Sequence, residues 1–351
     1  MAAGAGGGPT HPHDPPMPGD LVESVPNFSE GRRGEVVDEI VAAFAGAHPD
    51  VLVLDRSSDP DHNRSVLTLA GPGPALVEAA VAGTAACARL IDLTRHRGAH
   101  PRMGALDVLP FVPLRVGDDH LDHLGACAAL AVAAGRRLAE EVGIPVYLYG
   151  AAALRADRAR LPDVRGKGFE ELRAVAARDP GRAPDLGGPA PHPTAGATAV
   201  GARPFLIAYN VNLATGDPAP ARRIARAVRE RGGGLPAVRA LGLVLHGRGI
   251  TQVSMNLLDF RVTPPTAAFA AVAELARRER VEVVDSEIVG LVPEAALAGT
   301  DPASLALRDF SPDRLLEERL RRALVHRHEL AGFTKRRHKG DTPCQRLEGD
   351  R

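Results

Sequence analysis

One order of strands and helices occurs twice along this chain, and that repeat is what most constrains its fold. Apolar residues at strand and helix spacing predict strand, helix, strand, strand, helix, strand between residues 21 and 113, and the same six elements between residues 205 and 284. This order is typical of the split βαβ pattern of ferredoxin-like folds. The sequence therefore predicts an α+β fold with two ferredoxin-like (βαββαβ) subdomains and a ligand groove between them.

The predicted elements leave a linker and two tails around the repeats. In the first half we expect strands at 21–25, 51–54, 64–70 and 106–113, a turn at 27–33, helices at 34–47 and 75–93, and then a helix at 119–142 and a strand at 145–149. In the second half we expect strands at 205–213, 240–246, 252–260 and 281–284, helices at 220–231 and 266–278, and a closing helix at 312–331. The linker, 151–201, holds a short helix and then a Gly/Pro-rich run, which is predicted to lack regular structure and to cover a ligand. We thus expect a disordered arm at 1–19, an N-terminal subdomain at 20–200, a C-terminal subdomain at 201–333 and a disordered tail at 334–351.

Charge and composition exclude several classes of protein. The chain has 43 basic and 43 acidic side chains among 351 residues, whereas a general nucleic-acid-binding protein shows a basic excess. It has no apolar run near the roughly 18 residues that span a bilayer, and its first twenty residues do not resemble a secretory signal. Its three cysteines, Cys87, Cys127 and Cys344, are too few and too scattered for a disulfide framework or a zinc site. We expect a cytoplasmic protein that binds neither nucleic acid nor membrane.

The segment from residue 91 to 113 carries the clearest chemistry. It places His96 and His100 four residues apart and surrounds them with Arg95, Arg97 and Arg102. Imidazole takes and gives protons near neutral pH, and guanidinium groups grip carboxylates. A loop that carries both is suited to acid/base chemistry on an anionic substrate.

A metal site is the alternative interpretation of the same segment. Asp92, His96 and His100 are spaced four apart and would share one face if this were a helix. Gly98 and Pro101 argue against that helix, because proline biases the residue before it to an extended conformation. The ring of His100 is then left able to face a cleft.

A second polar loop, residues 55–65, is explained largely by its turn-forming residues. Arg64, at the start of the following strand, could also bind a carboxylate, and loops 55–63 and 94–105 would lie at comparable strand ends and line one wall. In the run at 25–32, Ser29 with Arg32 could simply cap the next helix. Exposed backbone N–H groups there could instead hold an anion.

Several motifs together resemble the formiminotransferase family, and in particular its glutamate formimidoyltransferases without a cyclodeaminase domain. They keep the order of the family between about residues 20 and 330. The matching runs are VESVPNFSEGR (22–32), DHNRSV (61–66), LIDLTRHRGAHPRMGALDVLPFVP (90–113), IPVYLYG (144–150), LPDVRGKGFEEL (161–172), PDLGGPAPHPTAGATAVGARPFLIAYNVNL (184–213), QVSMNLLDF (252–260) and SEIVGLVP (286–293).

The resemblance implies an enzyme that moves the formimino group from N-formimino-L-glutamate to N5 of tetrahydrofolate, a step in histidine degradation. It implies two ferredoxin-like subdomains with folate between them, a homodimer, and no metal or redox cofactor. The general acid/base histidine of the family falls on His100. The folate-contacting loop falls on Gly187, Gly188, Pro189, Ala190, Pro191, His192, Pro193, Thr194, Ala195 and Gly196. Both substrates carry glutamate carboxylates, so Arg64 and Arg102 are the arginine anchors that we expect.

Two positions depart from the family pattern. Ala195 stands where relatives can place an aromatic residue, and Ser57 stands where a relative can carry an acid. Stacking on the pterin is therefore expected to be weaker or supplied elsewhere, and no catalytic carboxylate is assigned at Ser57. Bifunctional relatives append a helical cyclodeaminase domain, for which this sequence leaves no room, so we expect release of 5-formimino-tetrahydrofolate.

Three other functions remain open at this point. A relative could transfer formyl between 5-formyltetrahydrofolate and glutamate, and the loops do not separate the two donors because imino and oxo groups are similar in size. A folate-binding protein without turnover, or a metal hydrolase using His96 and His100, would also fit parts of the pattern.

Overall fold

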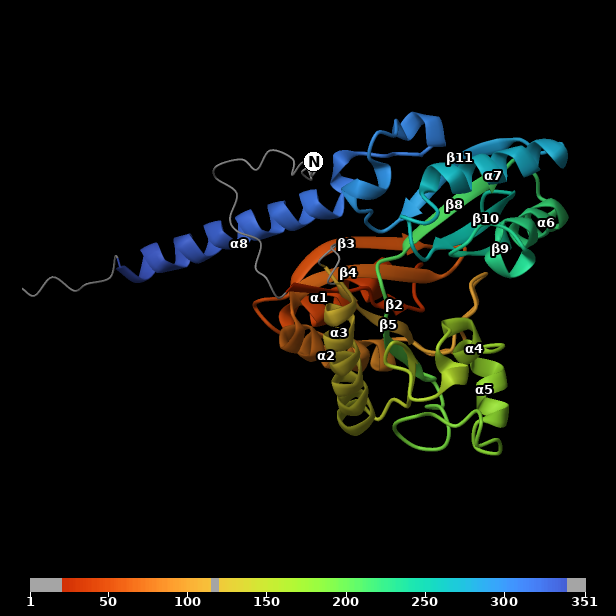
Figure 1. The fold of residues 1–351 in the computed structure, drawn as a ribbon. Helices are drawn as coiled ribbons and strands as arrows, with labels where there is room; N and C mark the ends of the chain where they lie inside the picture. Colours follow the sequence, from red (N-terminus) through yellow and green to blue (C-terminus); the bar gives the residue numbers. More distant parts are fainter. Residues whose placement is uncertain (1–20, 115–119, 340–351) are drawn as a thin grey trace, which may run out of the picture.

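A computed structural model describes residues 21–114 and 120–339, which form a mixed α/β molecule with two β-sheets (Figure 1). The predicted arm at 1–19 and most of the predicted tail lie outside these residues. Among the described residues no helix is both long and apolar enough to cross a membrane.

The N-terminal sheet has seven strands. They are β1 (Leu21–Ser24), β2 (Asn27–Phe28), β3 (Leu52–Asp59), β4 (Arg64–Pro72), β5 (Leu106–Pro113), β6 (Val146–Gly150) and β7 (Thr198–Ala202). Their order is β1-β4-β2-β5-β7-β6, with β3 paired to β4 and β1 also paired to β5. Pairings of β7 with β5 and with β6 are parallel, and the others are antiparallel.

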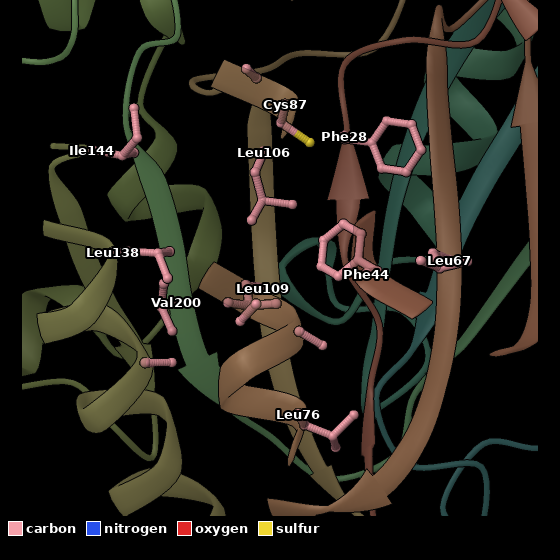
Figure 2. Packing of buried hydrophobic residues seen from close by; sticks show 14 of the residues in the cluster. Phe28, Phe44, Leu67, Leu76, Cys87, Leu106, Leu109, Leu138, Ile144 and Val200 are labelled. Atoms are coloured by element: carbon pink, nitrogen blue, oxygen red, sulfur yellow. The ribbon is translucent and has the colours of Figure 1, made fainter. Parts of the chain in front are cut away.

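Three helices cover the N-terminal sheet and close its core: α1 (Gly34–Gly46), α2 (Gly73–Leu90) and α3 (His120–Arg137). Figure 2 shows side chains from helices and strands meeting there, among them Phe44 of α1, Leu76 of α2 and Leu109 of β5, each at most 1% exposed. The α3 helix continues into a π-helical turn, η1 (Leu138–Val142), which ends at Gly143 in the left-handed region. This apolar layer packs on one face of the sheet, and the site lies at the opposite face.

The C-terminal sheet has four antiparallel strands in the order β11-β8-β10-β9. They are β8 (Ile207–Leu213), β9 (Val238–Leu245), β10 (Ile250–Leu257) and β11 (Val283–Val289). Two helices, α6 (Pro218–Val228) and α7 (Pro265–Arg278), pack on one face through buried residues such as Ile224 and Val272. Asp217 caps α6 by accepting a hydrogen bond from the backbone N–H of Ala219, which satisfies a donor at the helix start.

The helix α8 (Leu316–Lys339) joins the two halves. Leu316, Leu320 and Leu324 form a buried cluster with Leu52 and Leu54 of β3, and Figure 1 shows α8 leaving the C-terminal half and running beside β3. The apolar contact fixes the N-terminal sheet against the C-terminal half. The helix extends eight residues past its predicted end and so includes the first residues of the predicted tail, whose Lys and Arg are good helix formers.

The prediction that the Gly/Pro-rich run of the linker lacks regular structure was wrong, because the run contains β7. Where one short helix was expected before it, the linker has two, α4 (Leu161–Arg165) and α5 (Phe169–Val175). All five residues of β7 are buried between β5 and β6, and Gly201 lies where an added Cβ would come 2.4 Å from the Tyr149 carbonyl oxygen. Glycine in this run allows the strands to pack closely. Because glycine is also common in loops, the composition of the run alone does not show that it is a strand.

Other differences are shifts of element bounds. The predicted turn at 27–33 contains β2, and β3 continues through Ser57 and Ser58 to Asp59. Among the strands that the structure describes, β3 pairs only with β4, so it is an edge strand, where polar side chains are tolerated. Short 3₁₀ turns complete the chain at Ala156–Arg158, Glu230–Gly232, Glu294–Leu297, Pro302–Leu305 and Pro312–Arg314.

Candidate active site

A cavity of about 430 Å³, here called the central cavity, lies between the two sheets. The N-terminal sheet supplies Val66 and Thr68 from β4 and Val108 from β5, and the C-terminal sheet supplies Asn210 from β8 and Ser254 from β10. Charged and titratable side chains also line it. They are Glu23, His62, Arg64, His100, Tyr149, Arg165, Arg203 and Arg239.

His100 lines this cavity, and a hydrogen bond fixes which tautomer its neutral ring adopts. Its Nδ1 lies 2.7 Å from the carbonyl oxygen of Pro101. A carbonyl oxygen can only accept, so Nδ1 carries the proton in the neutral ring and Nε2 keeps a lone pair. Burial, followed by the charges of Arg64 and Arg165, holds the pKa of His100 well below its usual range. A neutral imidazole with a lone pair on Nε2 can act as a base at neutral pH.

Two loops that sequence analysis expected on one wall do come together. The backbone N–H of Ala99 donates to the Asp61 carbonyl over 3.0 Å, and Asn63 donates through Nδ2 to the Arg97 carbonyl over 3.0 Å. At Gly98 an added Cβ would stand 2.1 Å from the His62 carbonyl oxygen. Only glycine allows this approach, which places the rings of His62 and His100 with their centroids 5.7 Å apart.

His96 and Arg102 hold the loop and lie away from the central cavity's lining. His96 is 7% exposed and donates from Nε2 to the Asn63 carbonyl, while its Nδ1 accepts from Arg102 Nε. Arg102 also makes two hydrogen bonds to the carboxylate of Glu170, at 2.7 and 2.8 Å. With His100 it lines a separate cavity of about 510 Å³, the loop cavity. Because its guanidinium is already bound by a carboxylate, Arg102 serves first as a tie between the loop and α5.

Arg64 is part of a buried ionic cluster at the central cavity. Asp107 Oδ2 accepts from Arg64 at 2.6 Å and from Arg165 at 2.8 Å, and Asp107 Oδ1 accepts from the Met103 backbone N–H. Arg64 also bonds Asn27 Oδ1. Burial alone would raise the pKa of Asp107, but the two arginines hold it well below its usual range. One carboxylate thus balances two cations, and the cluster keeps an excess positive charge for an anionic ligand.

Two other side chains at the central cavity have unused hydrogen-bonding atoms. Within the described residues, His62 Nε2 and Arg165 Nε are buried and have no hydrogen-bond partner. Buried polar atoms are almost always paired. Unpaired ones facing a cavity therefore indicate atoms that a ligand or water completes.

The predicted folate loop, residues 187–196, lies behind the His100 loop. Thr194 and Ala195 accept through their carbonyls from the backbone N–H groups of Leu93 and Ala105, and Gly196 bridges Gly104. Ala195 is 2% exposed within the apolar core. None of the residues 187–196 is among those lining the three described cavities. The loop supports the backbone next to His100, and its role in folate binding stays a prediction.

A further cavity of about 650 Å³, the side cavity, adjoins the central one and shares His62, Arg64 and Asn210 with it. Ser57 of β3 lines it. Four more arginines, Arg32, Arg248, Arg308 and Arg314, line it together with four acidic residues, Asp59, Asp61, Glu287 and Asp309. The side cavity is therefore of mixed charge, and the excess positive charge lies at the Arg64 cluster that borders both cavities.

The helix cap proposed at Ser29 was wrong. Ser29 Oγ donates to the Gly104 carbonyl, whereas Glu30 Oε1 accepts from the backbone N–H groups of Gly31, Arg32 and Arg33 before α1. Glutamate reaches forward along the turn, so it satisfies the donors that would otherwise hold an anion. For the metal alternative, the described residues contain no group of three or more His, Cys, Asp or Glu side chains placed to hold an ion.

Sequence reasoning missed Glu23 and Arg165, which line the central cavity, and Asp107, which bonds Arg64 and Arg165 beside it. Asp107 is fully buried in β5, and a carboxylate inside the apolar run LDVLPFVP was a usable signal, because buried acids are nearly always paired. Glu23 in the strand LVES carried the same signal. Arg165 gave none, because arginines are common throughout this chain.

These observations define a class: a two-sheet α/β protein with a basic, histidine-containing cavity between its sheets. Family comparison makes this specific. The N-terminal subdomain of the formiminotransferase domain matches residues 21–203, and the formiminotransferase domain matches residues 208–313. The chain belongs to the formiminotransferase family.

Curated relatives agree with this assignment. The chain is 45% identical over 304 residues to "Glutamate formimidoyltransferase" of Thermoplasma acidophilum, which covers 86% of this chain and 98% of that protein. It is 41% identical to "Glutamate formimidoyltransferase" of Streptococcus pyogenes serotype M1, covering 83% and 95%. It is 45% identical to "Formimidoyltransferase-cyclodeaminase" of Sus scrofa, covering 79% of this chain but 51% of that protein.

Proposed function

We propose that this protein is a folate-dependent glutamate formimidoyltransferase, which moves the formimino group of N-formimino-L-glutamate to N5 of tetrahydrofolate in histidine degradation. Relatives that carry this enzyme name match over almost their whole length. The single observation that carries the proposal from the structure is His100, neutral and with a lone pair on Nε2, at a basic cavity between the sheets.

The fold proposed with this function is a pair of ferredoxin-like subdomains, at 20–200 and 201–333. In the C-terminal sheet the strands follow the order second, third, first, fourth along the chain, from β9 to β11. The N-terminal strands repeat this order from β3 through β4 and β1/β2 to β5, with β7 and β6 added at the end. The two family matches, at 21–203 and 208–313, divide the chain at nearly the same place.

The reaction requires proton transfer in two directions. Attack by N5 of tetrahydrofolate on the formimino carbon forms a tetrahedral adduct, in which the attacking nitrogen must lose a proton. The bond from the carbon to the glutamate nitrogen then breaks, and that nitrogen gains a proton. His100 Nε2 can take the first proton and return it to the leaving nitrogen, a contribution of about 10²- to 10⁴-fold.

Charge in the cavity suits the two substrates. Both end in glutamate carboxylates, and the Arg64–Asp107–Arg165 cluster carries one cation in excess, with an unpaired Nε on Arg165. These arginines also repel a proton from His100, since their charges lower its pKa. The same groups that hold the anion therefore keep the base neutral.

The remaining parts of the proposal rest on the family and on composition. The chemistry needs tetrahydrofolate as a co-substrate and no metal, and loop 187–196 is retained as the folate-contacting loop. Cys87 and Cys127 are free and buried, which fits a reducing cytoplasm. Assembly as a homodimer, without nucleic acid or membrane as partner, stays a prediction.

Assay with both donors tests the function. Purified protein should release glutamate from N-formimino-L-glutamate only when tetrahydrofolate is present, with a new 5-formimino-tetrahydrofolate absorbance. Activity confined to the 5-formyltetrahydrofolate–glutamate pair would assign the formyltransferase alternative. Folate binding without turnover of either donor would assign the non-catalytic alternative.

A further inference from the structure

Glu23 is a buried acid that the mechanism above does not use. It lies in β1, opposite Ala70 of β4 and Val112 of β5. Its side chain lines the central cavity, yet the residue is 2% exposed. Within the described residues its Oε2 is buried and has no hydrogen-bond partner. A carboxylate oxygen in this position is an acceptor that the protein itself leaves open.

Such a group is unfavourable in the absence of a ligand. Burial raises the pKa of Glu23 to about 7, and Arg203 only partly opposes this. A buried polar group without a partner reduces stability, so a fold without a use for this carboxyl would favour an apolar residue. An unpaired acceptor on a side chain that lines a cavity indicates a ligand donor.

Glu23 and the Arg64 cluster that acts on His100 are attached at different positions along β4. Arg64, which acts on the charge of His100, bonds Asn27, and Asn27 pairs with Val66, whereas Glu23 pairs with Ala70. Four residues of β4 separate these register positions, roughly 13 Å at about 3.3 Å per residue. A spacing of this size along β4 leaves room for two fused six-membered rings beside the strand.

The walls of the central cavity suit a flat ring. Val66, Val108 and Pro110 supply apolar surface from the N-terminal sheet, and Ala208 and Leu258 supply it from the C-terminal half. Thr68, Asn210 and Ser254 add neutral hydrogen-bonding groups to the same lining. A bicyclic ring with apolar faces and hydrogen-bonding edges fits walls of this kind.

We propose that Glu23 binds the pterin ring of the folate substrate by accepting hydrogen bonds from its N3–H and 2-amino group, and so directs N5 toward His100. The inference rests on the proposed function. Two parallel N–H donors on one ring edge match the two oxygens of a carboxylate, as a guanidinium fork does. Glu23 is thus a positioning residue that touches the far edge of the substrate and takes no part in proton transfer.

The test compares two variants with two ligands in equilibrium binding. Glu23→Gln keeps the shape but removes the charge and one acceptor, and Glu23→Ala removes the group. The probes are 5-formyltetrahydrofolate and its analogue without the 2-amino group. As a matched control, Glu35→Gln changes an exposed glutamate of α1 that lines none of the three cavities. Thermal melts confirm that each variant is folded.

We expect both Glu23 variants to bind 5-formyltetrahydrofolate about 10- to 100-fold more weakly, since hydrogen bonds to charged groups contribute in this range. Wild-type protein should also lose affinity for the analogue without the 2-amino group, whereas Glu23→Ala should bind both ligands alike. In turnover the KM for tetrahydrofolate should rise more than kcat falls. Glu35→Gln should bind as wild type does.

Equal affinity of wild type and Glu23 variants for 5-formyltetrahydrofolate would overturn the inference and leave the proposed function intact. The inference would also be overturned if Glu23→Ala still bound the analogue without the 2-amino group more weakly than 5-formyltetrahydrofolate, because the two losses of affinity would then be additive. Failure of wild-type protein to bind any reduced folate would instead remove the proposed function and the inference with it.

Discussion

The two sheets enclose one cavity but contribute different chemistry to it. From the N-terminal sheet and its loops come the histidines, the Asp107 cluster and Glu23, whereas β8 and β10 contribute neutral side chains such as Asn210 and Ser254. Among the described residues that line the cavity, buried atoms without a hydrogen-bond partner belong to Glu23, His62 and Arg165. At this cavity the N-terminal half thus supplies the histidines and the unpaired atoms, and the C-terminal half supplies neutral side chains and one arginine, Arg239 of β9.

The polar groups next to the side cavity differ in the same way. On the C-terminal sheet Gln252 donates to Asn212 and to Glu287, and Glu287 is paired with Arg308. These contacts hold β8, β10 and β11 together with partners from within the same half, and within the described residues Gln252 Oε1 and Thr251 Oγ1 are left without a hydrogen-bond partner. Hydrogen bonds among its own side chains make the C-terminal sheet rigid. The N-terminal sheet has polar side chains at the cavity that are able to bind a ligand.

Among the variants considered, replacement of His100 should have the largest effect on turnover. His100→Ala is expected to lower kcat by about 10²- to 10⁴-fold, the usual contribution of positioned proton transfer, while the affinity for folate stays within a few-fold. Steady-state assays with equilibrium binding of 5-formyltetrahydrofolate measure both. His326→Ala, at an exposed position of α8, is the matched control. Turnover unchanged in His100→Ala would remove this residue from the mechanism.

Asp107→Asn should come next, because it leaves Arg64 and Arg165 without their shared carboxylate. Breaking a buried ion pair destabilises by about 3–5 kcal/mol, and we expect kcat/KM to fall about 10- to 100-fold as the guanidinium groups and the His100 loop lose their order. Denaturant melts and kinetics measured well below the melting temperature separate the two effects. Asp163→Asn, which breaks a surface pair with Arg160, should change little; equal losses in both variants would argue against the cluster.

Glu23→Gln should stabilise the protein without ligand above neutral pH. The pKa of Glu23 is raised from 4.5 to about 7 in the folded state, so between these values the folded state binds more protons than the unfolded state and stability falls as pH rises. At pH 8 the ionised carboxyl therefore destabilises by on the order of 3 kcal/mol, which the amide avoids. Thermal melts of both proteins at pH 4.5 and pH 8 should diverge only at the higher pH. A constant difference at both pH values would contradict the raised pKa.

The pH dependence of kcat/KM should show an acid limb below the ordinary value for histidine. Burial and two nearby arginines lower the pKa of His100, so the neutral base persists as pH falls through 6.5, and activity is lost only at lower pH. A profile from pH 4.5 to 8 for wild type and Asp107→Asn measures this. An acid limb at or above pH 6.5 in the wild type would mean that His100 is not held neutral.

Ser254→Ala, on the covering sheet, should have the smallest effect. Loss of one neutral hydrogen bond is worth about 0.5–1.5 kcal/mol, so the KM for folate should rise less than about tenfold with kcat unchanged. A drop in kcat comparable to that of His100→Ala would show that the C-terminal sheet also carries reactive groups.

Local periodicity was enough to predict most of the scaffold from the sequence. The strand 106–113 was predicted with its observed bounds, and the repeated element order is present in both halves. The strand β7 was missed because the run TAVGA owes its conformation to two parallel neighbours far away in the chain. The edge strand β3 was cut short for a related reason, since its polar end is stabilised by pairing with β4.

Site residues could be predicted where neighbours in the sequence indicate their role. They could not be predicted where the role depends on contacts between distant parts of the chain. His100 stood out through its neighbours in the chain, and Arg64 was correctly expected at a strand start. That Glu170 would engage Arg102, and that Asp107 would join Arg64 to Arg165, depended on contacts between residues 43 to 68 positions apart. Contacts of the same kind join Thr194 and Ala195 of loop 187–196 to Leu93 and Ala105 on either side of the His100 loop.

A crystal structure of the protein with 5-formyltetrahydrofolate tests the central claim most directly. The account predicts the pterin between the two sheets, with N5 within about 3.5 Å of His100 Nε2 and the 2-amino edge at Glu23. A pterin bound in the loop cavity or the side cavity, or a His100 ring directed away from N5, would contradict it.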